Sequence, residues 1–315
     1  MAAYAEGQEL SRSDRHLPGL GRSQQLEAIG FGAQSLAALA GCSVDKAPWK
    51  CHVTSGVYGM SRDFETLVTE AVADAKRHEG WDFSHLHGRR HSQGVPWSYD
   101  TTVLKLLERS DDVLDIDTGG GEKLLSLYQG CARWPQRAIA IEAYKPNLSV
   151  AQRNLASIGV KVRPYASSDS LPFDAAAFSL VINRHGQYSA AEVARILRPG
   201  GVFVTQQVGS DMCIGLNQAL DAGRPQSSNW ALERACGELR SAGLDLLEKE
   251  ESHGKDLFDD VGAVVWYLCV VPWQIPGFTL DGYREQLFAL HASIEANGPF
   301  DAGNHLFFIK AGKPN

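Results

Sequence analysis

Short hydrophobic runs alternate with stretches of helical periodicity from about residue 110 to the end of the chain. The predicted strands lie at 113–116, 138–141, 161–163, 178–182, 202–208, 244–247 and 306–309. The predicted helices lie at 122–129, 146–158, 190–197 and 230–241. This alternation predicts a doubly wound α/β fold, in which a mostly parallel seven-stranded sheet carries helices on both faces.

The same pattern divides the chain into three parts. Residues 1–58 show weak periodicity and are predicted to be an accessory N-terminal extension. Residues 59–109 are predicted to form a helical lid, since apolar residues near the start recur at spacings of three and four. The main domain, 110–315, contains an insertion at about 252–299 before its last strand. We expect the apolar stretch in this insertion, 261–273, either to pack against the lid helix or to line an apolar pocket.

Composition and charge narrow the classes of partner. The chain has 315 residues and a net charge of −7, which disfavours binding to a nucleic-acid duplex. Its longest apolar run, Val261–Val271, is about half the length that a bilayer-spanning helix needs. The N-terminus has no apolar segment of the signal-peptide kind. These features predict a cytoplasmic protein without a membrane partner.

Cysteine and histidine spacing gives no sign of a metal site. The six cysteines are widely spread, and no two of them share a CxxC spacing. His85, His87 and His91 form a loose group whose nearby acids are Asp82 and Asp100 only. We therefore predict no metal site and expect free thiols in a reducing compartment.

A glycine-rich segment follows the first predicted strand and precedes a helix. It runs from Asp115 through Gly119, Gly120 and Gly121 to Glu122. Glycines suit a turn where the backbone approaches a ligand closely. The segment lacks the G-x-G-x-x-G fingerprint of dinucleotide sites and the Gly-Lys-Ser/Thr of phosphate-binding loops. Glu122 also places a negative charge where a pyrophosphate would bind. The loop therefore favours a cofactor without phosphates.

In this region the chain resembles the class I S-adenosylmethionine-dependent methyltransferases, which have a Rossmann-like fold. The first strand of that family ends in an acid followed by spaced glycines, matched by Asp115, Gly119 and Gly121. The family's acid at the end of the second strand is matched by Glu142. A carboxylate suits two ribose hydroxyls because each of its oxygens accepts a hydrogen bond. The turn at 197–201, Leu-Arg-Pro-Gly-Gly, also matches.

The resemblance implies S-adenosyl-L-methionine as the cofactor. A polar position near its adenine amino group falls at Ser168 and Asp169. The cofactor contacts that the resemblance implies are Asp115, Asp117, Thr118, Gly119, Gly121, Glu142, Ala143, Ser168, Asp169 and Asn183.

Asp117 departs from the family pattern, which has glycine at this position. A positive φ at an aspartate costs about 1 kcal/mol. Its carboxylate would repel the methionyl carboxylate of the cofactor or attract its amino group. A site that binds weakly or no longer supports turnover is therefore an alternative interpretation.

The residues after the fourth strand are the candidates for the acceptor side. His185 is a candidate general base because imidazole titrates near neutral pH, and Arg184 is a candidate for holding an acceptor carboxylate. Both have a structural alternative, a backbone hydrogen bond for His185 and a surface salt bridge for Arg184. Trp97, Tyr99 and Tyr188 are the predicted substrate or lid residues, with packing in the core as the alternative.

The function predicted from these features is transfer of a methyl group to a small-molecule acceptor by direct in-line attack. One alternative is methylation of a ribosomal RNA base, for which Arg89 and Arg90 with Trp97 and Tyr99 would supply charge and stacking. A second is a cofactor-binding protein without turnover because of Asp117. A dehydrogenase is a minor alternative.

Overall fold

The computed structural model describes residues 63–166, 170–224 and 229–315. The predicted N-terminal extension, 1–58, lies outside the described residues, as do Ser168 and Asp169.

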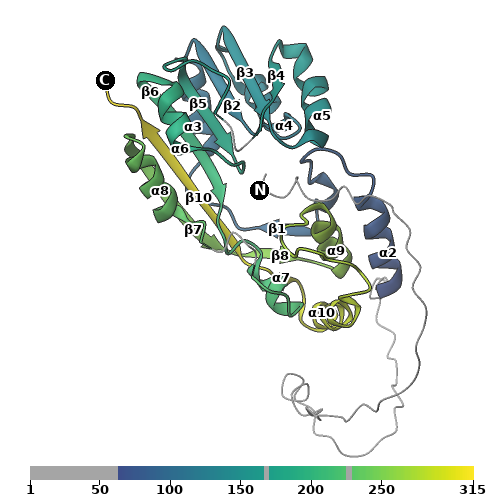
Figure 1. The fold of residues 1–315 in the computed structure, drawn as a ribbon. Coiled ribbons are helices and arrows are strands. Elements are labelled where there is room, and N and C mark those ends of the chain that lie inside the picture. The colour runs from purple at the N-terminus through teal and green to yellow at the C-terminus, as the bar shows by residue number, and fades with distance from the viewer. Residues whose placement is uncertain (1–62, 167–169, 225–228) are drawn as a thin grey trace, which may run out of the picture. The chain divides into compact units, whose positions relative to one another are not determined.

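Seven strands form one large sheet (Figure 1). Their order is β4-β3-β2-β5-β6-β10-β7, and every neighbouring pair from β4 to β6 is parallel, whereas β10 is antiparallel to both of its neighbours. The strands are β2 (Asp112–Ile116), β3 (Arg137–Glu142), β4 (Lys161–Pro164), β5 (Phe178–Arg184), β6 (Leu197–Val208), β7 (Asp245–Gly254) and β10 (Asn304–Gly312). The predicted mostly parallel seven-stranded sheet is confirmed.

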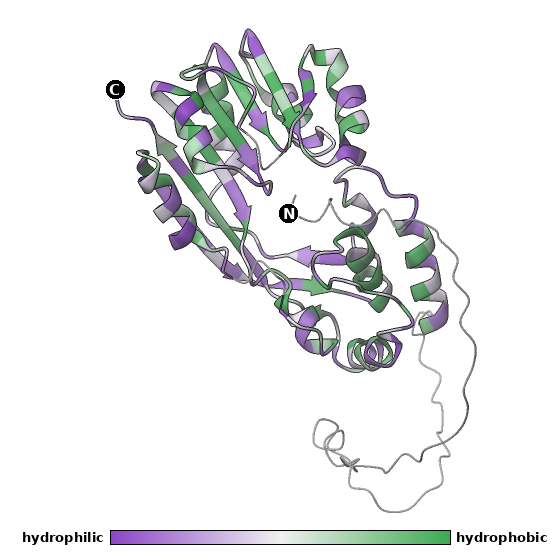
Figure 2. Ribbon diagram, in the orientation of Figure 1, coloured by the Kyte–Doolittle hydropathy of each residue, from purple (hydrophilic) through white to green (hydrophobic). Residues whose placement is uncertain are grey.

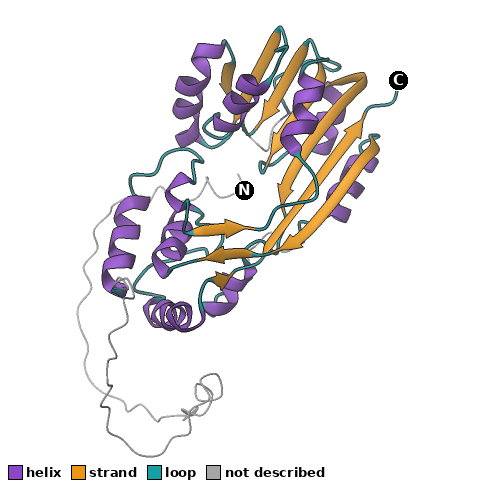
Figure 3. Ribbon diagram, turned by 180° about the vertical axis from the view of Figure 1, so that it is seen from behind, coloured by secondary structure: helices purple, strands orange, loops and turns teal. Residues whose placement is uncertain are grey.

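Helices cover both faces of this sheet (Figure 3). They are α3 (Tyr99–Leu107), α4 (Glu122–Gly130), α5 (Lys145–Leu155) with the 3₁₀ turn η3 (Ala156–Ile158), α6 (Ala190–Ile196) and α8 (Leu232–Ser241). One core joins α6 and α8 to the sheet, and another joins α3, α4 and α5 to it. Successive apolar side chains of the inner strands point alternately into the two cores, as a doubly wound fold requires.

A second group of elements has its own core and a small sheet of order β1-β8-β9. These elements are α2 (Phe64–Ala75), η2 (Ser84–Leu86), β1 (Arg90–Ser92), α7 (Ile214–Ala219), β8 (Asp256–Phe258), α9 (Val261–Val270), α10 (Arg284–Asn297) and β9 (Phe300–Asp301). We call this group the lid layer. α9 is hydrophobic along its length (Figure 2), and its residues 261–268 are all buried. The apolar stretch of the insertion thus packs with α2 in the core of the lid layer.

None of the helices in the described ranges is both long and apolar enough to cross a bilayer.

Candidate cofactor and acceptor site

The glycine loop connects the end of β2 to the start of α4. Gly119 and Gly121 have φ angles of +65° and +82°, which side chains rarely tolerate. A Cβ atom on Gly121 would lie 2.8 Å from Cγ of Leu155, so α5 can pack against the loop only when this residue is glycine. The loop is therefore a tight turn at the carboxyl edge of the sheet, where open α/β folds bind ligands.

Glu142 is the last residue of β3, and its side chain reaches the glycine loop. It is only 4% exposed. Its Oε2 accepts a hydrogen bond from the Gly119 amide at 2.6 Å, and its Oε1 accepts one from the Tyr144 amide at 2.7 Å. Burial and the negative charge of Asp117 raise the pKa of Glu142 to about 8, although the two amide hydrogen bonds lower it. The structure thus brings together the two features from which the cofactor was predicted.

Asp115 and Thr118 are also buried next to the same loop. Burial, with the charge of Asp117, raises the pKa of Asp115 to about 7, while a contact with Thr118 lowers it. The Thr118 amide donates to the Ile141 carbonyl at 3.1 Å and ties the loop to β3. Asp115, Asp117 and Glu142 therefore concentrate carboxyl groups around one turn, and their mutual repulsion favours a cationic ligand.

Asp117 adopts a φ of +53°, so the aspartate takes the left-handed backbone conformation that glycine would take without strain. Its Oδ1 accepts a hydrogen bond from the Tyr165 hydroxyl at 2.7 Å, and its Oδ2 accepts one from the Gln187 amide at 2.9 Å. Tyr165 follows β4 and Gln187 follows β5. Burial raises the pKa of Asp117, whereas these hydrogen bonds and the Ala143 amide lower it. The carboxylate thus joins the loops that follow three different strands.

Trp81, between α2 and η2, covers the glycine loop. A Cβ atom on Gly119 would lie 2.6 Å from Cδ1 of Trp81, so the indole rests directly on the glycine. Trp81 stacks with Phe83 at a centroid distance of 5.9 Å and meets Trp273 edge-on at 5.3 Å. Trp81 begins an aromatic stretch that runs to Tyr99, before the first strand of the large sheet. Trp97 and Tyr99 were the predicted lid residues of this stretch, but the residue that contacts the loop is Trp81.

A cavity of about 340 Å³ adjoins Trp81. Its lining includes Trp273, the exposed ring of Tyr144 and Asn147 near the start of α5. Asn147 is 2% exposed, and its Nδ2 has no hydrogen-bond partner in the described part of the chain. An unpaired buried amide is costly, so this donor favours a ligand with an acceptor atom in the cavity.

Trp97 and Tyr99 pack against the sheet. Trp97 donates through its indole Nε1 to Oε1 of Gln206 on β6 at 2.8 Å and packs on Phe308. Tyr99 is 4% exposed and belongs to the core beneath α3. Both rings therefore pack in the core, and Tyr99 also lies close enough to Asp115 and Arg184 for their charges to affect its pKa. Their role as substrate or lid residues stays a prediction.

His185 follows β5 and is held by the same glutamine. Its Nε2 lies 3.0 Å from Nε2 of Gln206, whose Oε1 already accepts from Trp97. The amide of Gln206 is thus the donor, and Nε2 of His185 is the acceptor. Burial and the positive charge of Arg184 hold the pKa of His185 well below its usual value. The imidazole is neutral, but its basic nitrogen is occupied, so a role as general base would require Gln206 to turn away.

Arg184 ends β5, and burial lowers the pKa of its guanidinium. It forms no ion pair with any acid in the ranges 63–166, 170–224 and 229–315, so the predicted surface salt bridge does not exist among those residues. A partly buried cation without a paired acid is suited to an anionic ligand group.

Asn183 and Tyr188 both make contacts inside the protein, and their predicted ligand contacts stay predictions. Asn183 is completely buried, and its amide donates to the Ile116 carbonyl while its oxygen accepts from Thr205. It therefore positions the end of β5 against β2. Tyr188 packs edge-on against Phe203, in the core beneath α6 and α8, and its buried hydroxyl has no hydrogen-bond partner among the described residues.

No protein-family model and no curated protein matches this sequence. Among solved structures, a proposed methyltransferase from Bacillus halodurans is 18% identical, with 70% of this chain and 100% of that chain covered and a TM-score of 0.51. The YcgJ protein from Bacillus subtilis is 19% identical, with 69% and 98% covered and a TM-score of 0.47. At 18% identity, the similarity to the Bacillus halodurans protein indicates a shared fold only. The chain has the fold of the class I S-adenosylmethionine-dependent methyltransferases.

Proposed function

We propose that this protein is an S-adenosylmethionine-dependent methyltransferase with a small-molecule acceptor. The observation that supports it best is the 2.6 Å hydrogen bond between the Gly119 amide and Glu142. It makes the glycine loop and the acid of the next strand into one unit at the carboxyl edge of the sheet. Ligands of open α/β sheets bind at this edge.

The hydrogen-bonding groups beside the glycine loop fit the nucleoside half of the cofactor. Each oxygen of an ionised carboxylate accepts about two hydrogen bonds, and each oxygen of Glu142 receives one from the backbone. One acceptor position per oxygen is left for the two ribose hydroxyls. Tyr144 and the unpaired amide of Asn147 lie next along the chain and line the adjoining cavity, as an adenine contact would require.

The methionyl half meets Asp117 and Arg184. The carboxylate of Asp117 fits the cofactor's ammonium group, and the guanidinium of Arg184 fits a carboxylate of the cofactor or the acceptor. When bound, the sulfonium supplies an electrophilic methyl group. Trp81, which meets Trp273 edge-on, covers the loop and excludes water there, and the chain's remaining task is to align the acceptor.

An RNA acceptor is disfavoured by the ion pairs of the lid layer. Arg89 donates to both carboxylate oxygens of Asp260, at 2.8 and 2.6 Å. Arg90 donates to both oxygens of the fully buried Asp256. Paired in this bidentate way, the two arginines hold the lid layer together and are not free to bind phosphates.

A second candidate function is cofactor binding without turnover. It is favoured by the two hydrogen bonds of Asp117, which hold the loops after β2, β4 and β5 together where the family pattern has glycine. S-adenosylmethionine would then have to break the hydrogen bonds of Asp117, or it would bind with its methionyl end outside the loops that Asp117 joins.

Calorimetric titration with S-adenosylmethionine and its demethylated product tests the proposal, followed by incubation with radiolabelled cofactor and fractionated cell extract. We expect heat from both ligands and label in the small-molecule fraction. Binding without label in any fraction would establish the second candidate. Absence of heat with both ligands contradicts the proposal, and label confined to RNA or protein contradicts the acceptor class.

A further inference from the structure

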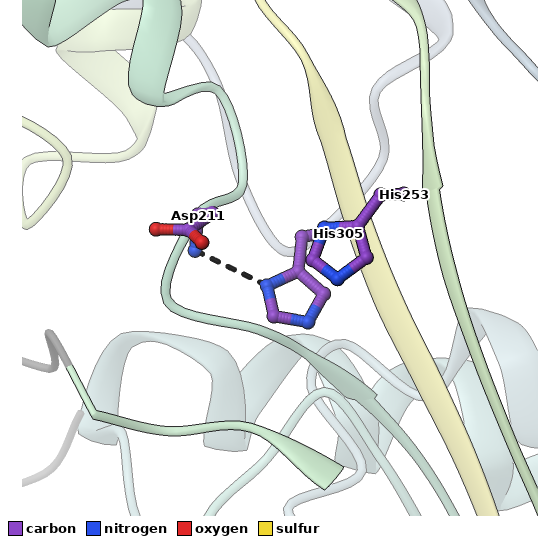
Figure 4. A group of neighbouring side chains, drawn as sticks. All are labelled: Asp211, His253 and His305. Carbon is purple, nitrogen blue, oxygen red and sulfur yellow. Dashed lines mark hydrogen bonds between the residues drawn. The ribbon is translucent and has the colours of Figure 1, made fainter.

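Asp211, His253 and His305 lie together where β6 ends (Figure 4). Asp211 is in the turn that follows β6, and His253 near the end of β7 is the register partner of His305 near the start of β10. One potential ligand atom from each lies within 4.8 Å of the others. Among the residues that the structure describes, no other group of three histidine, cysteine or acidic residues meets this criterion.

Hydrogen bonds at both ring nitrogens orient the imidazole of His305. It is 2% exposed, and its Nε2 lies 3.0 Å from Oε1 of Glu251. Because a carboxylate only accepts, Nε2 carries the proton, and Nδ1 directs its lone pair toward Asp211. The Asp211 amide approaches Nδ1 at 3.3 Å, longer than most N–H···N or N–H···O bonds. Pairing with a carboxylate in this way orients metal-binding histidines in many proteins.

The backbone makes room for this arrangement at Gly209. A Cβ atom there would lie 2.2 Å from the ring of His305, so a larger residue would displace the imidazole. The ring of His253 stacks on His305 with centroids 4.1 Å apart and is exposed to solvent. The Asp211 carboxylate has an exposed ion pair with Arg224 at 3.2 Å, for which water competes.

We propose that Asp211, His253 and His305 bind a divalent cation of borderline softness, best matched by Zn²⁺. Two imidazole nitrogens and one carboxylate oxygen form a three-ligand set with an open fourth position. The ion takes the place of the Asp211 amide at Nδ1 and of Arg224 at the carboxylate, and the exposed His253 rotates to close the set. Sequence spacing predicted no metal site because the three ligands come from separate segments.

The experiment uses the full chain after chelator treatment, titrated with Zn²⁺ in competition with a chromophoric chelator and, separately, with Co²⁺ as a spectroscopic probe. His253→Ala removes one exposed ligand and should abolish one equivalent of binding. Glu251→Gln keeps all three ligands and should weaken binding by about 10- to 100-fold, the usual effect of losing the carboxylate behind a metal-bound histidine. His91→Ala is the matched control, since His91 is exposed and contacts a carboxylate, Asp259, in the lid layer.

The Co²⁺ spectrum distinguishes this site from binding at cysteines. Nitrogen and oxygen ligands give d–d bands without thiolate charge-transfer bands, and the d–d bands should be lost in His253→Ala but not in His91→Ala. Equal affinity in wild type and His253→Ala overturns the proposal. So do charge-transfer bands that persist in His253→Ala, because cysteines would then hold the ion. The result is independent of methyl transfer.

Discussion

Glu142 and Asp117 are two carboxylates at the same glycine loop, yet their partners differ in kind. Glu142 receives hydrogen bonds from the amides of Gly119 and Tyr144, next to where it ends its own strand. Asp117 receives them from Tyr165 and Gln187, in the loops after β4 and β5. The first arrangement ties the acid to the glycine loop and to the end of its own strand. The second uses the acid to join separate loops.

This difference shows that the partners of a buried acid, rather than its burial alone, decide what it can do. Burial raises the pKa of both residues, and the charge of Asp117 is a further cause for Glu142. The two acids therefore oppose each other's ionisation, and a cationic ligand between them would relieve that opposition.

The largest expected effect is that of Glu142→Ala on binding of the nucleoside. Loss of the charge-assisted hydrogen bonds should weaken adenosine and S-adenosylmethionine alike by about 1–3 kcal/mol. Calorimetry with both ligands measures this. Glu285→Ala, an exposed acid in the first turn of α10, is the matched control and should retain wild-type affinity. An unchanged affinity in Glu142→Ala would mean that the ribose lies elsewhere.

The next effect is the pH dependence of adenosine binding. Glu142 has a pKa of about 8 in the free protein, so its carboxyl group holds a proton below that pH and accepts ribose hydroxyls best above it. Below pH 8 the affinity should rise with pH, by at most about tenfold for each pH unit. Above about pH 8 it should level off. Binding near neutral pH should release a proton, which titration in buffers of different ionisation enthalpy detects. A flat profile would contradict the assignment.

The same pKa shift has a consequence for stability with the opposite sign. The folded pKa of Glu142 is raised above its unfolded value of about 4.3, so the native state binds more protons between those two values. Its contribution to stability is complete below pH 4 or so and is lost as the pH rises to about 8.

Hydrophobic runs were enough to predict the inner strands, because those strands are buried on both faces. β7 extends to Gly254, well beyond the predicted end at 247, through residues that are mostly charged. It is an edge strand that pairs with β10 alone, so its side chains need not be apolar. The small sheet of the lid layer could not be predicted either, because β1 pairs with β8 across more than 160 residues of sequence.

In the candidate site, the sequence spacing of motifs predicted those contacts that the path of the backbone determines. Gly119 and Glu142 come together because consecutive parallel strands end at one edge. Trp81, Asn147 and Gln206 were missed because their contacts depend on side-chain direction and on a layer assembled from distant segments. For Trp81, the aromatic stretch before the first strand was the only signal in the sequence.

The smallest effect, and the most selective, is expected for Asp117→Asn. At about pH 9, where Glu142 is ionised in both proteins, the variant should bind adenosine as the wild type does, but S-adenosylmethionine about fivefold more weakly, because a neutral amide replaces the partner of the ammonium group. Tyr165→Phe is the matched control, since it removes a hydrogen bond of Asp117 and keeps its charge. Equal losses for both ligands would place Asp117 at the nucleoside. A gain in S-adenosylmethionine affinity would show that the carboxylate obstructs the methionyl end, in which case the difference between the two acids is that one admits the cofactor and the other restricts it.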